Sequence, residues 1–440
     1  AAGSAVGLGN IWRFPYLAAK YGGGIFLLVY IILALTFGYT MIVAESALGR
    51  MTRKSPVGAF RSFAKGKKVG WLSFGGWINA IIPVLIVPYY SVIGGWVVKY
   101  LFEYIRGNGS KLAEDGYFSG FISNGGTTEI CFVIFCMFTL VIIYAGVQNG
   151  IERVSKIMMP ILIVLSVIIA IYSVTRPGAI EGVKYFLVPN VKNFSWMTVV
   201  AAMGQMFYSL SIAMGILVTF GSYMRKDTSI EDSTRNVEIF DTAIAMMAGL
   251  MIIPAVFAFS GGDPDTLQAG PSLMFITIPK VFANMGFGTA VGILFFVLVL
   301  FAAVTSSIAL TESAVSTFED ELGWGRKKAT VLTGVIMIAL GTLSCLGYGP
   351  LDFVKIIGMQ FLDFFDFLTN SVMMPIAALM TSLLVSRVIG VDKIEEEIRH
   401  GESAFRRKKI FVVMIKYLCP IFALIILASS VANAFGWIVM

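Results

Sequence analysis

Long, uninterrupted apolar runs restrict most strongly what this chain can fold into. One of them, IFLLVYIILALTFGYTMIVA at residues 25–44, matches the roughly 20 residues that a helix needs to cross the hydrocarbon core of a bilayer. The runs lack the alternating pattern of the strands that form membrane barrels. Only 13% of the residues are charged, against about 25% in soluble domains. The sequence therefore predicts an all-α integral membrane protein, since a bilayer admits only helices and closed barrels.

Eleven spans are expected if the first, a half-span at 10–20, is counted whole. The others are expected at 24–53, 70–105, 127–146, 150–176, 196–224, 234–260, 284–321, 328–347, 351–388 and 409–436. We expect the cytoplasmic half of the first span to be missing from the chain. Several spans exceed the length needed to cross and are expected to tilt.

Basic residues gather in the loops after the second and eighth spans and before the eleventh. By the positive-inside rule these loops are cytoplasmic, which leaves the loops at 106–126, 177–195 and 261–283 outside. The cytoplasmic set comprises Arg50, Arg53, Lys54, Arg61, Lys65, Lys67, Lys68, Arg326, Lys327, Lys328, Arg406, Arg407, Lys408 and Lys409. This distribution accounts for the net charge of +7 without a nucleic-acid partner.

The residue types that enzymes use are scarce. The single histidine, His400, lies in a charged loop, and the four cysteines lie in apolar segments, which implies no disulfide framework. Glu45 and Asp241 are acids within spans, but neither has a histidine, cysteine or second carboxylate beside it in sequence. The fragment GLGN has no preceding strand and does not complete a dinucleotide-binding motif. The chain is predicted not to be an enzyme and to carry no organic cofactor.

Two spans contain segments that oppose helix formation. They are GSAVGLGN at 3–10 and GQMFYSLSIAMG at 204–215, and they open successive five-span blocks. Broken helices at corresponding positions of two halves indicate a transport site near the bilayer midplane, where freed carbonyls coordinate a cation and helix N-termini attract a carboxylate. Glycines for close helix packing are the alternative. Packing accounts for the glycines but not for Asn10, Gln205, Ser209 and Ser211.

A third polar cluster is AAVTSSIAL at 302–310. Hydroxyls within apolar helices often bond back to the preceding turn, and this reading stays open for each residue. Hard cations such as sodium prefer hydroxyl and carbonyl oxygens. Three hydroxyls in succession are therefore also candidates for sodium ligands.

A family resemblance rests on motifs in the segments SAVGLGNIWRFPY, GGGIFLLVY, ESALGR, GIERVSKIMMP, GQMFYSLS, TSSIAL and FEDEL. Together, and in this order, they resemble the neurotransmitter:sodium symporter family, in particular its bacterial amino-acid branch, over nearly the whole chain. The resemblance implies a leucine-transporter-type fold with two inverted five-helix repeats plus an eleventh helix, helices 1 and 6 being broken at the midplane. The implied boundaries are 1–176 for the first repeat, 177–195 for an extracellular connection, 196–388 for the second repeat, and 389–440 for a cytoplasmic loop and helix 11.

The resemblance also implies site residues. The first sodium site is implied at Ala5, Asn10, Ser209 and Asp241, and the second at Gly3, Val6, Ala302, Thr305 and Ser306. Substrate contacts are implied at Ala5, Leu8, Gly9, Ile86, Tyr90, Tyr208, Ser209, Ser211, Met214, Ser306 and Leu310. Arg13 and Asp366 are the implied outer gate, and Tyr223 and Asp320 the inner one. Gly150 and Pro160 match a helix end that unwinds in relatives, although an ordinary kinked span explains them equally well.

The function implied is sodium-coupled import of a hydrophobic, aliphatic or aromatic L-amino acid by alternating access, in a multi-pass protein of the bacterial inner membrane. Its partners are then the amino acid, two sodium ions and membrane lipid. Monoamine members of the family carry aspartate where this chain has Gly7, so glycine indicates a substrate with its own carboxylate. Asp241 indicates independence from chloride, unless it is a solvated residue at a span end. Ala213 and Met214 have opposite effects on pocket size.

A sodium-dependent amino-acid sensor of the same fold is the alternative function. No segment marks a signalling domain, which disfavours it. The sequence leaves open which amino acid binds, the sodium stoichiometry, proton counter-transport and the oligomeric state.

Overall fold

The structure is a computed structural model that describes residues 7–64, 70–261 and 271–437. These residues are almost entirely helical, and the extended pairing found among them is an isolated bridge between Ile356 and Met359. The described part of the chain contains nine helical stretches that are long and apolar enough to cross a membrane. They are Gly24–Thr52, Gly70–Ile105, Gly125–Tyr144, Val147–Val174, Ile230–Ser260, Gly288–Leu322, Arg326–Leu346, Phe361–Ile389 and Lys408–Ala434.

Two of the eleven expected spans are absent from this set, because the first is described as a helix only over residues 9–20 and the sixth is divided into two short helices. The first is a π-helical segment, Gly9–Arg13, that continues into α2 (Phe14–Lys20). The sixth is divided into α12 (Trp196–Ser209) and α13 (Ile216–Tyr223).

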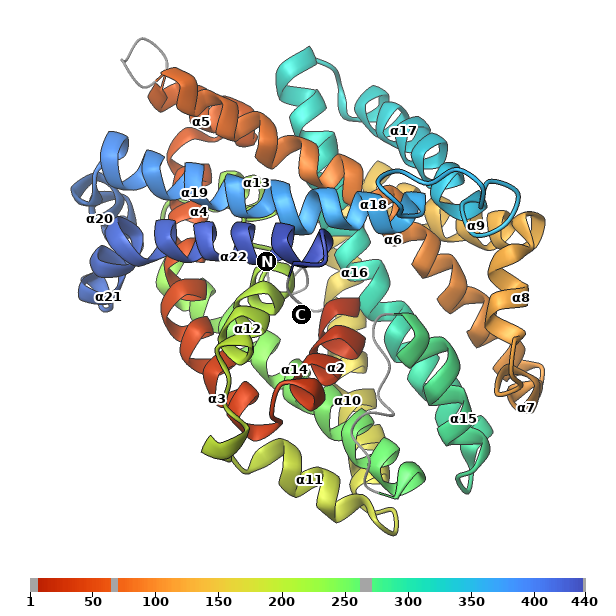
Figure 1. Ribbon diagram of the computed structural model, residues 1–440. Coiled ribbons are helices and arrows are strands. Elements are labelled where there is room, and N and C mark those ends of the chain that lie inside the picture. The colour runs from red at the N-terminus through yellow and green to blue at the C-terminus, as the bar shows by residue number, and fades with distance from the viewer. Residues whose placement is uncertain (1–6, 65–69, 262–270, 438–440) are drawn as a thin grey trace.

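The long stretches contain the labelled helices of Figure 1. They are α3 (Gly24–Leu33), α4 (Tyr39–Thr52), α6 (Ser73–Ile105), α9 (Gly125–Tyr144), α10 (Arg153–Val174), α14 (Ile230–Ser260), α16 (Gly288–Leu322), α17 (Arg326–Leu346), α18 (Phe361–Asp366), α19 (Met374–Leu383), α21 (Lys408–Val413) and α22 (Cys419–Ala434). Shorter helices connect them: α5 (Pro56–Ala64), α7 (Gly109–Leu112), α8 (Tyr117–Ser123), α11 (Ala179–Leu187), α15 (Ile278–Ala283) and α20 (Val391–Arg399).

Most span ends lie within a few residues of the expected positions, and the tenth differs most. It begins at Phe361 rather than at 351, because Ile357 and Gly358 both have positive φ, which a right-handed helix does not accept. The three loops expected outside also contain helices. These are α7 and α8 in the first, α11 in the second and α15 in the third.

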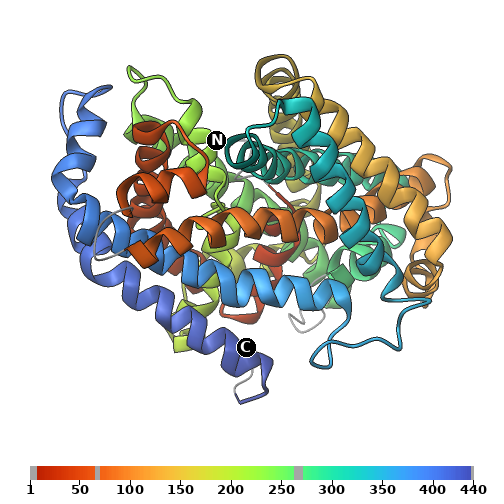
Figure 2. The ribbon, with the colours of Figure 1, turned by 90° about the horizontal axis from the view of Figure 1, so that it is seen from above.

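The broken helices lie at the centre of the bundle. Figure 1 shows α2, α12, α14 and α16 around the middle of the molecule, with α6 passing beside them. The Gly9–Arg13 segment contacts both α12 and α14, and α16 packs along α6. On the outside, α19 and α22 run side by side, as both Figure 1 and Figure 2 show. The arrangement places polar residues of the broken helices where surrounding helices exclude lipid.

Local conformation explains why the sixth span divides. Ser211, Ala213 and Gly215 have φ values of 55°, 58° and 71°, which no right-handed helix accepts. Ser211 and Ala213 are unusual residues for this region because each carries a Cβ. The amide of Ala213 donates to Oε1 of Glu45 at 2.9 Å, and the Glu45 side chain is fully buried on α4. This contact anchors the non-helical segment to a neighbouring helix.

Candidate functional site

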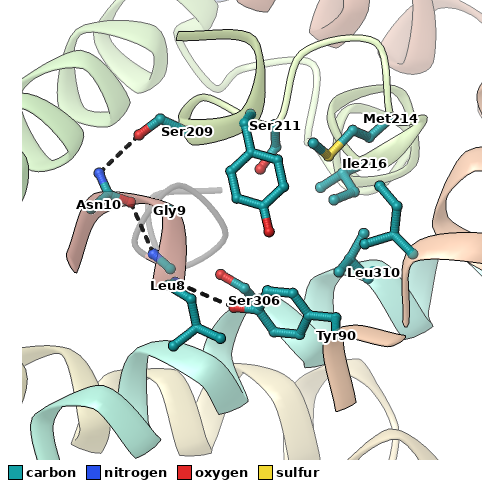
Figure 3. A pocket seen from close by; sticks show the side chains of 13 residues that line it. Leu8, Gly9, Asn10, Tyr90, Ser209, Ser211, Met214, Ile216, Ser306 and Leu310 are labelled. Atoms are coloured by element: carbon teal, nitrogen blue, oxygen red, sulfur yellow. Dashed lines mark hydrogen bonds between the residues drawn. The ribbon is translucent and has the colours of Figure 1, made fainter. Parts of the chain in front are cut away.

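A cavity lies at the centre, between the two broken helices, α6 and α16. Figure 3 shows its polar side, with Asn10 and Ser209, opposite an apolar side with Met214, Ile216 and Leu310. The described residues that line it are Gly7, Leu8, Gly9, Asn10, Ile86, Tyr90, Tyr208, Ser209, Ser211, Met214, Ile216, Ser306 and Leu310. Every substrate contact implied by sequence lies on this lining except Ala5, which is outside the described residues. Ile216 was missed, because it follows the break in an ordinary apolar run.

The polar side is organised around the Asp241 carboxylate on α14, which is fully buried. Its Oδ1 accepts from Asn10 Nδ2 at 2.8 Å and from the Ser209 hydroxyl, and its Oδ2 accepts from the Tyr30 hydroxyl at 2.5 Å. The Asn10 amide also donates to Ser209 Oγ at 2.9 Å. These contacts bring together the described members of the first implied sodium site, and Tyr30 adds a hydroxyl to them.

All donors to Asp241 are neutral. No lysine or arginine in the described ranges forms an ion pair with it, although other buried acids do have one. An unpaired anion within a membrane protein costs several kcal/mol. The arrangement of a carboxylate, an amide and a hydroxyl is suited to a small hard cation.

Two glycines allow close approach around the cavity. A Cβ on Gly7 would lie 2.4 Å from Ser306 Oγ and 3.4 Å from the Tyr90 hydroxyl, and a Cβ on Gly9 would lie 2.4 Å from the Tyr208 ring. The Leu8 amide donates to the Tyr90 hydroxyl at 3.4 Å. The Gly9 carbonyl accepts from Gln205 Nε2 at 2.9 Å. No acidic side chain lines the cavity within 7–64, 70–261 and 271–437, so its amide and hydroxyl donors can face a carboxylate carried by a ligand.

The second implied sodium site is only partly described. Gly3 and Val6 lie outside the described residues, and Ala302, Thr305 and Ser306 lie on α16. The Thr305 hydroxyl bonds back to the carbonyls of Phe301 at 3.0 Å and Ala302 at 3.1 Å, as the alternative reading expected. A hydroxyl that donates in this way still has lone pairs with which to bind a cation.

A second cavity, of about 360 Å³, reaches Thr305 from the side of α10 and α13. It is lined by Val147, Ile151, Glu152, Ser155, Lys156, Phe220, Tyr223, Thr305, Ile308 and Ala309. Beside it the chain is π-helical over Val147–Glu152, which includes Gly150. A Cβ on Gly150 would lie 2.1 Å from the Ile142 carbonyl oxygen, and Pro160 interrupts the hydrogen bonding of α10. The chain is therefore irregular at Gly150, whereas Pro160 lies within an α-helix that continues on both sides of it.

The implied outer gate residues face a larger vestibule of about 730 Å³. The guanidinium of Arg13 lies over the Tyr208 ring, 5.5 Å from its centroid. Asp366 accepts from the Tyr89 hydroxyl at 3.2 Å and from Asn370 Nδ2 at 2.5 Å. Within the part of the chain that the structure describes, Arg13 and Asp366 share the vestibule without forming an ion pair.

The implied inner gate residues have separate partners. Asp320 accepts from the Ser55 amide at the start of α5. Tyr223 donates to Glu312 Oε1 at 2.7 Å, and Arg326 Nη1 donates to the same oxygen at 3.0 Å. Glu312 is fully buried. Sequence reasoning missed this pair, and the only signal was an acid within the apolar run IALTESAV.

Comparison with known proteins agrees with this geometry. A model described as the Sodium:neurotransmitter symporter family matches residues 1–110 and 117–436. An uncharacterized sodium-dependent transporter of Bacillus subtilis, YhdH, is 35% identical over 98% of this chain and 95% of its own. An uncharacterized sodium-dependent transporter of Haemophilus influenzae is 32% identical over the same shares. A crystal structure of MhsT in complex with L-phenylalanine superposes with a TM-score of 0.86, at 36% identity over 98% of this chain and 96% of that one.

Proposed function

Because the chain belongs to the sodium:neurotransmitter symporter family, we propose that it couples sodium entry to the import of a hydrophobic L-amino acid and needs no chloride. It is a multi-pass membrane protein of a family of sodium-dependent transporters and not an enzyme. Bacterial relatives agree with a place in the cell membrane. The substrate class, the number of ions, the repeats at 1–176 and 196–388 and the roles of individual residues are the proposal.

The observation that carries the amino-acid assignment is the absence of an acidic side chain among the described residues that line the central cavity. An amine substrate would bring a positive charge with no fixed carboxylate there to pair with it. An amino acid supplies its own carboxylate, which the amides of Leu8 and Gly9 and the Tyr90 hydroxyl can receive. Opposite, Ile86, Met214, Ile216 and Leu310 offer an apolar surface to its side chain. The complex of MhsT with L-phenylalanine supports the same class.

Chloride independence follows from Asp241. The first sodium ion would bind between Asn10, Ser209 and this carboxylate, whose charge then balances the ion without a mobile anion. Asn10 turns its amide nitrogen towards Ser209 and Asp241, so the amide plane must rotate for its oxygen to coordinate sodium. The substrate carboxylate shares this ion, and the shared contact couples the two bindings.

A second sodium ion would use the hydroxyls of Thr305 and Ser306. The cavity that reaches Thr305 gives this ion a water-filled path, and the helix end that carries Gly150 and Pro160 can widen it. Arg13 and Asp366 would close the vestibule when substrate is bound, and Asp320 and Tyr223 would open on the other side. Alternating closure of these two paths converts binding into transport.

Two measurements test the proposal. The first is a scintillation-proximity panel of the twenty amino acids with and without sodium, which should show sodium-dependent binding of apolar members and no binding of dopamine-like amines. The second is uptake into proteoliposomes under a sodium gradient. Accumulation supports transport, whereas binding without accumulation would establish the sensor function instead. Sodium-independent binding would contradict the coupling.

A further inference from the structure

The segment between the last two spans is held against the rest of the protein by charged contacts. This segment, residues 390–407, contains α20 and the turns after it, and we call it the strap. Its helix buries Val391, Ile394 and Ile398 and contacts α4. Figure 1 shows α20 and α21 at one end of α19 and α22, beside α4. Sequence analysis had treated this stretch only as a cytoplasmic loop.

The first anchor of the strap is Arg50, in the last turn of α4. Its side chain is fully buried, and Nε pairs with Glu397 Oε1 at 2.7 Å. Its Nη1 donates to the Thr228 carbonyl at 2.5 Å and its Nη2 to the Glu397 carbonyl. Lys226 Nζ reaches Glu397 Oε2 at 2.6 Å. One guanidinium thus joins α4, the strap and the link between α13 and α14.

The second anchor lies on the first turns of α14. The Glu231 carboxylate accepts from the amides of Arg406 at 2.8 Å and Arg407 at 3.2 Å, and from the Tyr39 hydroxyl. Arg407 pairs with the buried Glu238 at 3.0 Å, and its guanidinium lies over the Tyr39 ring, 4.5 Å from the centroid. Glu238 precedes Asp241 by three residues, about 4.5 Å along the helix axis.

A glycine brings the strap backbone directly onto this link. A Cβ on Gly401 would lie 2.4 Å from the Thr228 carbonyl oxygen and 2.7 Å from its carbonyl carbon. The backbone atoms there cannot move aside as a flexible side chain would. The strap therefore sits in contact with the α13–α14 link independently of its ion pairs.

These anchors hold the elements that form the central site. Helix α13 begins beside Met214, and helix α14 contains Asp241. In the proposed transport cycle, release of ions to the cytoplasm requires the inner ends of these two helices to separate from their neighbours. A buried ion pair adds little stability compared with apolar packing, so the four ion pairs that join the strap to α4, α14 and the link between α13 and α14 suggest a role in selecting a conformation. We propose that the strap holds the transporter closed to the cytoplasm, with Arg50 and Glu397 as positioning residues, and detaches when the inner path opens. This inference rests on the proposed alternating-access function.

Paired cysteine reporters test the strap. Ser155→Cys reports on the inner cavity and Ser430→Cys on the outer vestibule, and the native cysteines are buried. Each reporter cysteine is combined in one protein with Glu397→Gln or with Gly401→Leu, and its rate of labelling by a membrane-impermeant thiol reagent is measured. Glu395→Gln is the matched control, because Glu395 lies on the same helix and pairs with Arg399 and Lys408 rather than with α4 or α14.

We expect Glu397→Gln to raise the labelling rate at position 155 about tenfold and to lower it at 430, because loss of one charge leaves Arg50 buried without its partner. Gly401→Leu should act in the same direction, and the control should change neither rate. Lys226→Met removes a half-exposed ammonium and should change the two labelling rates in the same directions by about twofold. This variant replaces the others in the test if they fold poorly.

Opposite changes at the two reporters support the strap, since a merely structural defect would raise labelling at both. A rise at both positions, or no change at either, would overturn the inference. Sodium-driven uptake by the unmodified chain is measured alongside. If uptake is present while the reporters do not respond, only the strap is wrong; if uptake is absent, the proposed function itself fails.

Discussion

Asp241 and Glu312 are both fully buried carboxylates within membrane spans, yet their surroundings differ. Asp241 receives hydrogen bonds from an amide and two hydroxyls. Glu312 accepts a hydrogen bond from the Tyr223 hydroxyl and forms an ion pair with Arg326. Within the described residues, one carboxylate is paired with an arginine and the other is not, which is the arrangement expected if Asp241 balances a bound cation. The acid with no fixed partner is the one that faces the proposed sodium site.

The largest expected effect comes from removing the unpaired charge. Asp241→Asn keeps the shape and the amide contacts but leaves a bound sodium ion without a fixed anion. We expect uptake with gluconate as the only anion to fall about a thousandfold, since an unbalanced buried charge costs several kcal/mol, and to recover when chloride is supplied. Uptake that stays normal in gluconate would show that this carboxylate does not balance sodium.

Placing a new acid in the central cavity tests the proposal that the cavity receives the carboxylate of the substrate. Gly7→Asp would bring a side chain within 2.4 Å of Ser306 Oγ and add a negative charge where the substrate carboxylate should bind. Amino-acid binding in the presence of sodium should weaken roughly a hundredfold, because both contact and charge oppose it. Gly7→Ala separates the two effects by adding the contact alone. Equal loss in both variants would mean that charge plays no part there.

The paired acid should respond in stability rather than in sodium affinity. Glu312→Gln removes the charge that faces Arg326 and should destabilise the protein by about 3 kcal/mol, visible as a lower melting temperature in detergent. Sodium affinity at the central site should change less than about threefold, since the two acids share no partner. If sodium affinity falls as steeply as in Asp241→Asn, the distinction between the two carboxylates is wrong.

The smallest expected effect concerns Glu402 on the strap, which lies outside the spans. Its Oε1 accepts from the Glu231 amide at 2.8 Å. Burial raises its pKa above the ordinary value, the Glu231 carboxylate adds to this, and the Glu231 amide and Ser229 oppose it. Arg406 also faces it, and Arg406 pairs with Asp232.

The raised pKa means that Glu402 binds its proton more tightly when the strap is docked on the protein than when the strap is detached. Deprotonation of Glu402 therefore weakens docking as pH rises through that pKa. The labelling rate at Ser155→Cys, divided by that of a free thiol at the same pH because the thiolate is the reactive form, should increase modestly, about twofold, from acidic to neutral pH. Glu402→Gln should abolish the pH response. A response of equal size in that variant would assign it to another group.

The sequence predicted much of the fold because spans and breaks are local properties. Apolar length located the spans, and the cluster around Ser211 located the break in the sixth span; the break expected at 3–10 lies largely outside the described residues. It did not predict that Ala213, a residue with a Cβ, would adopt positive φ, because that depends on Glu45 from another helix. Ion pairs such as Arg326 with Glu312 and Arg50 with Glu397 were also missed. Arg50 was counted as a loop charge, and only the packed structure shows it buried.

The most direct test of the central claim is uptake of labelled L-phenylalanine or L-leucine by the unmodified protein in proteoliposomes, with an inward sodium gradient and gluconate replacing all chloride. The account predicts accumulation that requires the sodium gradient and is unchanged when chloride is restored. Accumulation that appears only with chloride would contradict the assignment of Asp241 as the fixed anion of the first sodium site.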